Sequence, residues 1–127
     1  MRAIDTNVLV RLVARDDDAQ VARATQIVSE PFLLLPSAVL ESEWVLRARY
    51  ALTRNRIADG FETVAGLPTA TVASAAALAW ALTRWRQSGD FADLLHIALA
   101  AEAGATAFAT FDQRITRDAP IPIEVLA

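Results

Sequence analysis

The sequence predicts a single α/β domain in which helices cover both faces of a central parallel sheet. Short apolar segments alternate with longer segments of helical spacing, and connections of that length join parallel strands rather than hairpins. The 127 residues correspond to one ordinary domain, of which 54% are hydrophobic and 21% charged, as is typical of a compact globular chain. We therefore predict one α/β/α sandwich over residues 1–127.

The first half of the chain contains two expected strands and four expected helices. Apolar residues recur there every three or four positions, and prolines at 31 and 36 enclose a short buried-type strand. Ser37 and Thr53 are the expected N-caps of the third and fourth helices. The expected strands cover residues 2–4 and 32–35, and the expected helices cover 6–13, 16–30, 37–50 and 53–65.

The second half contains three expected strands and two expected helices. An alanine-rich helix ends near Gln87, where Gly89 is suited to close it, and a further helix starts at Asp90 and ends at Gly104. Pro122 restricts the last strand to the edge of a sheet. The expected strands cover residues 69–73, 106–110 and 121–126.

Composition excludes several classes of protein. The chain has no Cys, so disulfides and thiolate metal sites are excluded, and all twelve basic residues are Arg, so lysine chemistry is excluded. No apolar run is long enough to span a bilayer, and the first residues already form a strand rather than a secretory signal. We therefore expect a cytoplasmic protein. Its net charge of −3 offers no broad attraction to nucleic acid, so a polyanion must be held by local Arg residues or by metal ions.

Two acidic residues follow the carboxyl ends of expected strands. Asp5 stands directly after residues 2–4, and Asp112 stands just after the strand that ends near Thr110. Ligands of parallel α/β sheets bind outside the carboxyl ends of the strands. We therefore expect Asp5 and Asp112 to lie on the same edge of the sheet.

Glu41 and Glu43 lie on the helix expected after Pro36. Neighbours on a helix are three or four residues apart, which gives Glu41 apolar neighbours and gives Glu43 the neighbour Arg47. A carboxylate on an apolar face must be paired, protonated or bound to metal. We assign Glu41 to a functional site and Glu43 to a solvated ion pair.

Asp90 and Asp93 present a similar choice. Asp90 is explained as the N-cap of its helix, and Asp93 is open to two interpretations. As an acid in the first helical turn, Asp93 complements the helix dipole. It also shares a helix face with Ile97 and Ala100, which directs it towards the sheet and makes it a candidate functional acid.

Four segments carry these acids: Asp5-Thr6-Asn7-Val8-Leu9, Val39-Leu40-Glu41-Ser42-Glu43-Trp44-Val45-Leu46, Asp90-Phe91-Ala92-Asp93-Leu94-Leu95 and Thr110-Phe111-Asp112. Together they resemble the four motifs of PIN-domain proteins, and most closely those of the VapC toxins of bacterial toxin–antitoxin pairs. The resemblance covers nearly the whole chain, in order and with suitable spacing. Each motif is short and unspecific alone, whereas four in order are specific.

The resemblance implies a ribonuclease that uses Mg²⁺ or Mn²⁺. It also implies a homodimer and a cognate VapB-type antitoxin that masks the active site. Thr110 and Asn7 match polar positions of the motifs. Asp118 lies too far beyond the last motif to match the additional acid of some relatives. The residues that match the family's catalytic and metal-binding acids are Asp5, Glu41, Asp93 and Asp112.

The chemistry of phosphodiester hydrolysis agrees with this set of residues. The reaction needs a nucleophilic water and neutralisation of charge on the phosphoryl oxygens, and hard divalent cations bound by oxygen ligands provide both. Four carboxylates without a His or Cys cluster suit Mg²⁺. Acids crowded together without metal raise one another's pKa and cost stability, which a bound cation relieves.

Three other functions remain to be weighed. An aspartyl phosphatase needs a second acid at position 7, where this chain has Asn7, and normally a Lys; a receiver-type signalling domain also needs a Lys. A non-catalytic PIN-fold module that binds an antitoxin or RNA is the remaining alternative.

Other conspicuous residues have structural interpretations. We expect a structural role for His96, the single histidine, and packing roles for the three tryptophans. An Arg cluster at positions 47, 49, 54 and 56 is either solvated or bound to RNA phosphates. We further expect an exposed apolar patch, suited to a partner helix, that consists of Trp44, Leu46, Tyr50, Leu52, Ile57 and Phe61.

Overall fold

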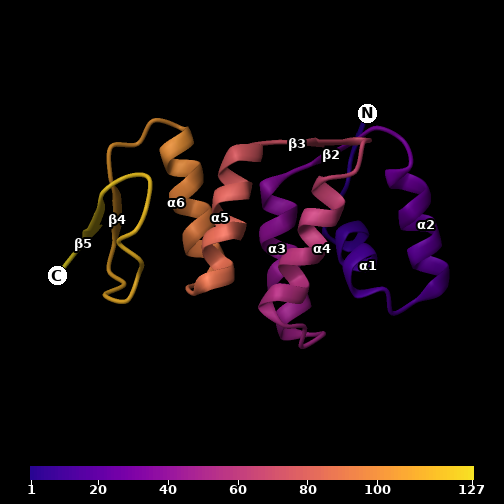
Figure 1. Ribbon diagram of the computed structural model, residues 1–127, viewed down its shortest axis with the longest axis horizontal. Helices are drawn as coiled ribbons and strands as arrows, with labels where there is room; N and C mark the ends of the chain where they lie inside the picture. Colours follow the sequence, from indigo (N-terminus) through magenta and orange to yellow (C-terminus); the bar gives the residue numbers. More distant parts are fainter. The chain divides into compact units, whose positions relative to one another are not determined.

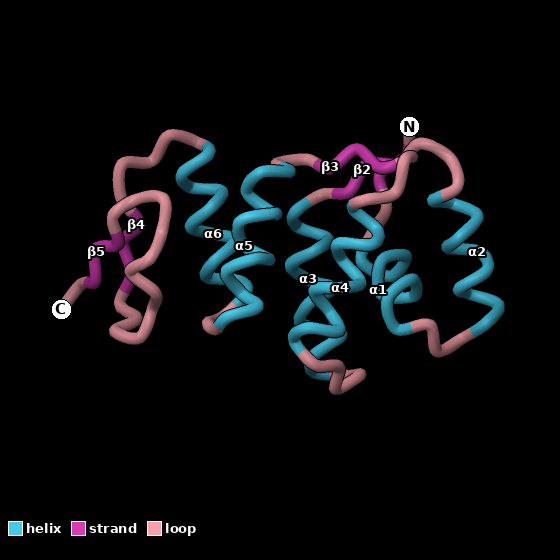
Figure 2. The backbone as a smooth tube through the Cα atoms, in the orientation of Figure 1, coloured by secondary structure: helices cyan, strands magenta, loops and turns pink.

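The computed structural model describes all residues, 1–127, and divides them into two compact units, Met1–Ala73 and Ser74–Ala127 (Figure 1). Helices make up most of the first unit and nearly half of the second, and the strands are short (Figure 2). None of the helices is both long and apolar enough to cross a membrane. In chain order the elements are β1 (Arg2–Ala3), α1 (Thr6–Ala14), α2 (Asp18–Val28), β2 (Phe32–Leu34), α3 (Pro36–Ala48), α4 (Arg54–Ala65), β3 (Ala70–Val72), α5 (Ala75–Gln87), α6 (Phe91–Glu102), β4 (Phe108–Thr110) and β5 (Ile123–Val125).

All strand pairs are parallel, which confirms the predicted α/β class. In the first unit the strand order is β1-β2-β3, with Arg2 opposite Phe32 and Leu33 opposite Thr71. Each connection between neighbouring strands contains two helices, as expected for parallel strands, which cannot be joined by tight turns. The carboxyl ends of β1 and β2 therefore lie at the same edge of this sheet, and they lead into α1 and α3.

The strands are divided between two sheets, whereas the sequence predicted one central sheet. In the second unit β4 pairs only with β5, with Phe108 opposite Ile123 and Thr110 opposite Val125. Asp5 therefore follows a strand of one sheet and Asp112 follows a strand of the other. The expectation that these two acids share the edge of a single sheet was therefore wrong, because their strands belong to different sheets.

Short polar side chains begin most of the helices. Asp5, Asp17, Thr53 and Asp90 each accept a hydrogen bond from a backbone N–H in the first turn of α1, α2, α4 and α6, respectively. The prediction that Ser37 is the N-cap of α3 was wrong, because α3 begins at Pro36 after Leu35. A proline suits the first helical position because its missing N–H would have no partner there.

The core of the first unit contains residues that the sequence placed on its surface. Leu46, Ile57 and Phe61 are fully buried. The predicted apolar patch therefore does not form from the six residues proposed, because half of them belong to the core. Of the remaining members, Trp44 is exposed and Tyr50 and Leu52 are half-buried.

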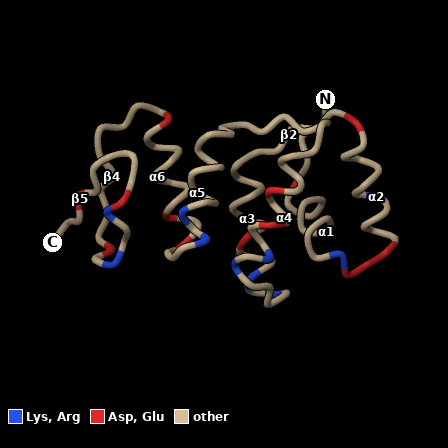
Figure 3. Tube along the Cα trace, in the orientation of Figure 1, with Lys and Arg blue, Asp and Glu red and all other residues tan.

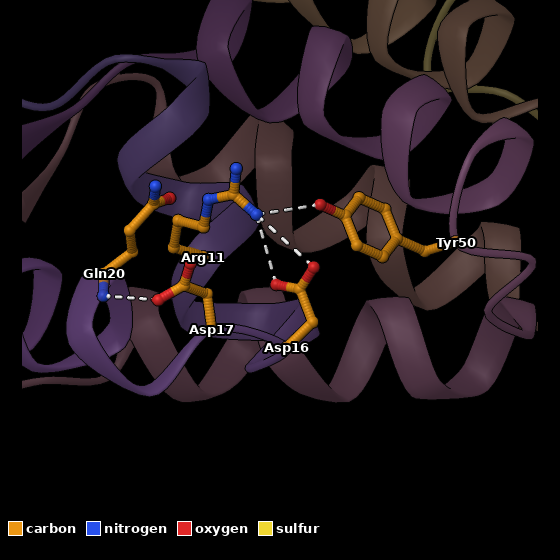
Figure 4. A network of polar contacts seen from close by, with 5 residues as sticks. All are labelled: Arg11, Asp16, Asp17, Gln20 and Tyr50. Carbon is orange, nitrogen blue, oxygen red and sulfur yellow. Dashed lines mark hydrogen bonds and ion pairs between the residues drawn. The ribbon is translucent and has the colours of Figure 1, made fainter.

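A polar network holds the end of α1 (Figure 4). The Nη1 atom of Arg11 donates to Asp16 Oδ1 at 3.2 Å and to the Tyr50 hydroxyl at 3.0 Å. Asp17 accepts from the backbone N–H of Gln20 at 3.1 Å and so begins α2. The guanidinium of Arg11 thus links Asp16, in the turn between α1 and α2, to Tyr50, which lies just after α3.

The second unit is built on the pair α5 and α6. Trp85 is buried and lies 5.1 Å from Phe91 between ring centroids, and Phe91 is also buried. Helix α6 ends in a Schellman motif, in which Gly104 has φ +90° and the N–H of Ala105 reaches the carbonyl of Ala100 at 2.9 Å. A glycine near position 104 was therefore a correct sign of the helix end.

Candidate active site

Asp5 stands where β1 ends and α1 begins. Its Oδ1 atom accepts from the N–H of Val8 at 3.2 Å, so the carboxylate is fixed at the positive end of the helix dipole. Its side chain lines a cavity of about 300 Å³ together with Thr6, Ser37 and Glu41. Asp5 and Glu41, which are 36 positions apart in the sequence, therefore open into the same cavity of the first unit.

Thr6 joins the two acid-bearing helices. Its hydroxyl donates to Glu41 Oε2 at 3.0 Å, and its carbonyl accepts from the Ser42 hydroxyl at 3.5 Å. Thr6, which follows Asp5, thus holds the Glu41 carboxylate. Ser42, which follows Glu41, holds the backbone of Thr6. Sequence reasoning missed both Thr6 and Ser42, although each is the direct neighbour of an acid that it selected.

Burial reverses the expected environments of Glu41 and Glu43. Glu41 is exposed to the cavity, whereas Glu43 is 3% exposed. The expected ion pair is present, with Arg47 Nε donating to Glu43 Oε1 at 3.1 Å, but it is not solvated at the carboxylate. The assignment of Glu41 to the site rested on an apolar face that belongs instead to Glu43, and its support now comes from the cavity and from Thr6.

Asp93 lies in the first turn of α6 in the second unit. It is half-buried, and its pKa is raised above the ordinary value of 3.8, first by burial and then by the negative charges of Asp90 and Asp112. His96, one turn further along, opposes this effect and is itself exposed. Asp93 and Asp112 are thus close enough within this unit for their charges to repel each other.

Asp112 is held in a tight turn after β4. Its N–H donates to the Thr110 hydroxyl at 3.1 Å, and its Oδ1 atom accepts from the N–H of Arg114 at 2.9 Å. Thr110, which the sequence singled out, therefore orients the backbone of the last acid. Asp112 as a whole is exposed to solvent.

The acids of each unit offer oxygen ligands of the kind that Mg²⁺ and Mn²⁺ take. Within its own unit none of them forms an ion pair with an arginine, so their charge is not neutralised there. Neither unit by itself contains a group of three or more such side chains that could hold a metal ion. The first unit contains Asp5 and Glu41, and the second contains Asp93 and Asp112.

Two other features of the first unit involve residues that the sequence singled out. Asn7, which matches a polar motif position, lines a cleft of about 190 Å³ between α1 and α2, together with Arg11 and Arg23. The arginines at positions 47, 49, 54 and 56 gather at the turn between α3 and α4 (Figure 3). Arg56 is partly engaged there, because its Nη2 atom donates to the carbonyl of Val13 at 3.3 Å.

A comparison with protein families gives one match. The model of the PIN domain matches residues 3–119, which include all four acids and nearly the whole chain. No curated protein matches the sequence. The match agrees with the parallel strands, the six helices and the order of the acidic motifs. The chain therefore belongs to the PIN-domain family.

Proposed function

We propose that this protein is a metal-dependent ribonuclease that hydrolyses phosphodiester bonds of RNA and acts as the toxin of a toxin–antitoxin pair in the cytoplasm. PIN domains are generally nucleases. The observation that carries the proposal is the pair Asp5 and Glu41, which share one cavity and are joined through Thr6. Asp93 and Asp112 complete the proposed set of catalytic and metal-binding acids.

The chemistry follows from what these residues present. A bound Mg²⁺ or Mn²⁺ supplies a Lewis acid for the phosphoryl oxygens and a nucleophilic water at neutral pH. Asp5 and Glu41 each spend one carboxylate oxygen on an internal hydrogen bond and keep the other for a ligand. Burial raises the pKa of Asp93 first and the negative charges of Asp90 and Asp112 raise it further, and a cation bound there would relieve this repulsion.

Replacing Asp5 with Asn tests the proposal. Asn is also a good N-cap, so Asp5→Asn keeps α1 intact while it removes a charged ligand. Asp17→Asn is the matched control, because Asp17 caps α2 in the same way and lies outside the cavity. We expect Asp5→Asn to abolish Mg²⁺- or Mn²⁺-dependent cleavage of RNA and Asp17→Asn to preserve it, with EDTA abolishing cleavage by every active variant. Undiminished cleavage by Asp5→Asn would contradict the assignment.

The alternative of a non-catalytic binding module is separated by the same assay. A purified chain that binds RNA but does not cleave it with either metal is a binding module. The uncompensated acids favour the enzyme, because a module that only binds RNA gains nothing from carboxylates that repel phosphates.

The proposed partners are a second copy of the chain and a VapB-type antitoxin. An Arg or Lys of the antitoxin would compete with the metal for the acids, and its apolar side chains would cover neighbouring surface such as Trp44, which is 53% exposed. A small protein encoded just upstream would be the candidate. We expect added Mg²⁺ to weaken its inhibition of RNA cleavage, and inhibition that is independent of Mg²⁺ would contradict charge replacement at the acids.

A further inference from the structure

Two large aromatic side chains are exposed away from the chain ends. Trp44 is 53% exposed and Phe111 is 72% exposed, and the other large apolar side chains with comparable exposure are Met1 and Leu126, at or next to the termini. The other aromatic rings of the chain are buried or half-buried, and Trp85 and Phe91, which are buried, pack on each other. The exposure of Trp44 and Phe111 is therefore not typical of the aromatic residues in this protein.

Both exposed rings adjoin an acid of the proposed site. On α3 Glu41, Trp44 and Arg47 follow one another at intervals of three residues, which places them along one strip of the helix about 9 Å long. Arg47 is 51% exposed, and its bond to Glu43 uses Nε and not the terminal amino groups. The strip thus presents a carboxylate, an indole ring and a guanidinium in that order.

Phe111 has the same two kinds of neighbour in the second unit. Phe111 directly precedes Asp112, and Arg114 lies two positions after Asp112. The hydrogen bonds of Asp112 to Thr110 and Arg114 fix the turn that carries the ring. Phe111 is therefore held in place while it remains exposed, which is costly for an apolar side chain unless a ligand covers it.

We propose that Trp44 and Phe111 are stacking platforms, each for an unpaired nucleobase of bound RNA beside the acids of its own unit. The inference rests on the proposed ribonuclease function. Base–aromatic stacking holds single strands with little regard for sequence, and the arginine beside each ring suits the adjoining phosphate. Stacking also answers the problem of charge, because a chain of net charge −3 cannot hold RNA by electrostatic attraction alone.

Binding of two matched oligonucleotides tests the proposal. The full-length protein in EDTA is titrated into a short labelled single-stranded RNA and into an abasic ribose-phosphate oligomer of the same length. We expect Trp44→Ala and Phe111→Ala each to raise Kd for the RNA by about 5-fold to 100-fold, the effect of losing one stacked base. Kd for the abasic oligomer should stay unchanged, and Trp44→Phe and Phe111→Tyr should bind RNA like the parent protein. Leu126→Ala, which removes an exposed apolar side chain away from the acids, is the control and should have no effect.

Each of three outcomes would overturn the proposal. Alanine variants that bind RNA as well as the parent protein does exclude stacking. A loss of equal size for the RNA and the abasic oligomer shows that the rings act on the backbone or the fold instead. If Trp44→Ala separates a dimer into monomers and leaves Kd for RNA unchanged, Trp44 is a contact to a second copy and not a stacking platform.

The binding assay separates this inference from the proposed function. A parent protein whose RNA binding depends on both rings but which cleaves nothing with Mg²⁺ or Mn²⁺ contradicts the nuclease proposal alone. If the alanine variants cleave RNA as well as the parent protein does, the stacking proposal alone is contradicted.

Discussion

At the scale of single residues, hydrogen bonds from neighbouring groups hold the carboxylates of the proposed site in position. Asp5, Glu41 and Asp112 are all exposed, so burial does not hold their carboxylates. Each is held instead by one short bond, from Val8 N–H, Thr6 hydroxyl and Arg114 N–H respectively. Such bonds set the direction of a ligand oxygen before a metal ion arrives.

Thr6 provides the first prediction at this scale. Thr6→Val keeps the shape of the side chain but removes the bond to Glu41, and we expect it to weaken Mn²⁺ binding by about 10-fold to 100-fold, as loss of a group that orients a ligand does. Thr6→Ser restores the hydroxyl and should restore the affinity. Thr63→Val removes a hydroxyl from the exposed face of α4 and is the control. Calorimetric titration measures each affinity, and equal affinities for Thr6→Val and the parent protein would show that the bond does not matter for metal.

Asp93 provides a prediction about pH. Its pKa is raised in the folded protein above 3.8, so the folded state holds the proton more tightly than the unfolded state does. The free energy of unfolding therefore falls as pH rises from 3.8 through the raised pKa. We expect Asp93→Asn to melt at a higher temperature than the parent protein at neutral pH, with the difference shrinking as pH falls towards 3.8. Thermal melting in EDTA checks this, and a difference that grows on acidification would show the opposite sign.

At the scale of elements, the sequence predicted the type of each element well and the buried face of each helix less well. The order of the elements and the caps at Thr53 and Asp90 follow from local patterns, and local patterns are what a sequence displays directly. The face that a helix buries depends on what packs against it. On α3 apolar residues occur almost all round the helix, so the spacing did not reveal that Glu43 faces inwards and Trp44 faces outwards.

The close packing of α1 and α4 gives a prediction for these two helices. A Cβ atom on Gly60 of α4 would lie 2.6 Å from Val13 of α1, which is too close for any real contact. We expect Gly60→Ala to lower the free energy of unfolding, because overpacking costs about 1–3 kcal/mol and exceeds the gain of up to about 1 kcal/mol in helix propensity. In a Val13→Ala background the two closest atoms are gone and the Cβ atom of residue 13, at 3.2 Å, is the nearest that remains, so the same change should cost less than in the parent protein. Urea unfolding measures both, and equal effects in the two backgrounds would show that Val13 is not the obstacle.

At the scale of the whole molecule, the acids are distributed over two units. Residues 1–73 contain Asp5 and Glu41, and residues 74–127 contain Asp93 and Asp112. The sequence selected these four acids by motif order, which does not depend on how the units are arranged. Strand pairing was less predictable, because a strand of two or three residues has too few side chains to specify its neighbour.

Metal binding should reveal whether acids of both units act together. A ligand that binds the folded state raises the melting temperature by mass action, so Mn²⁺ should raise that of the parent protein. If one ion depends on both pairs, Glu41→Gln in the first unit and Asp112→Asn in the second should each remove most of the shift. Asp17→Asn, which changes an acid outside the cavity, should keep it. Each variant is compared with its own melting temperature in EDTA, so that any effect of the substitution on the fold cancels. A shift that is lost in Glu41→Gln and intact in Asp112→Asn would confine the metal to the first unit and remove Asp112 from the site.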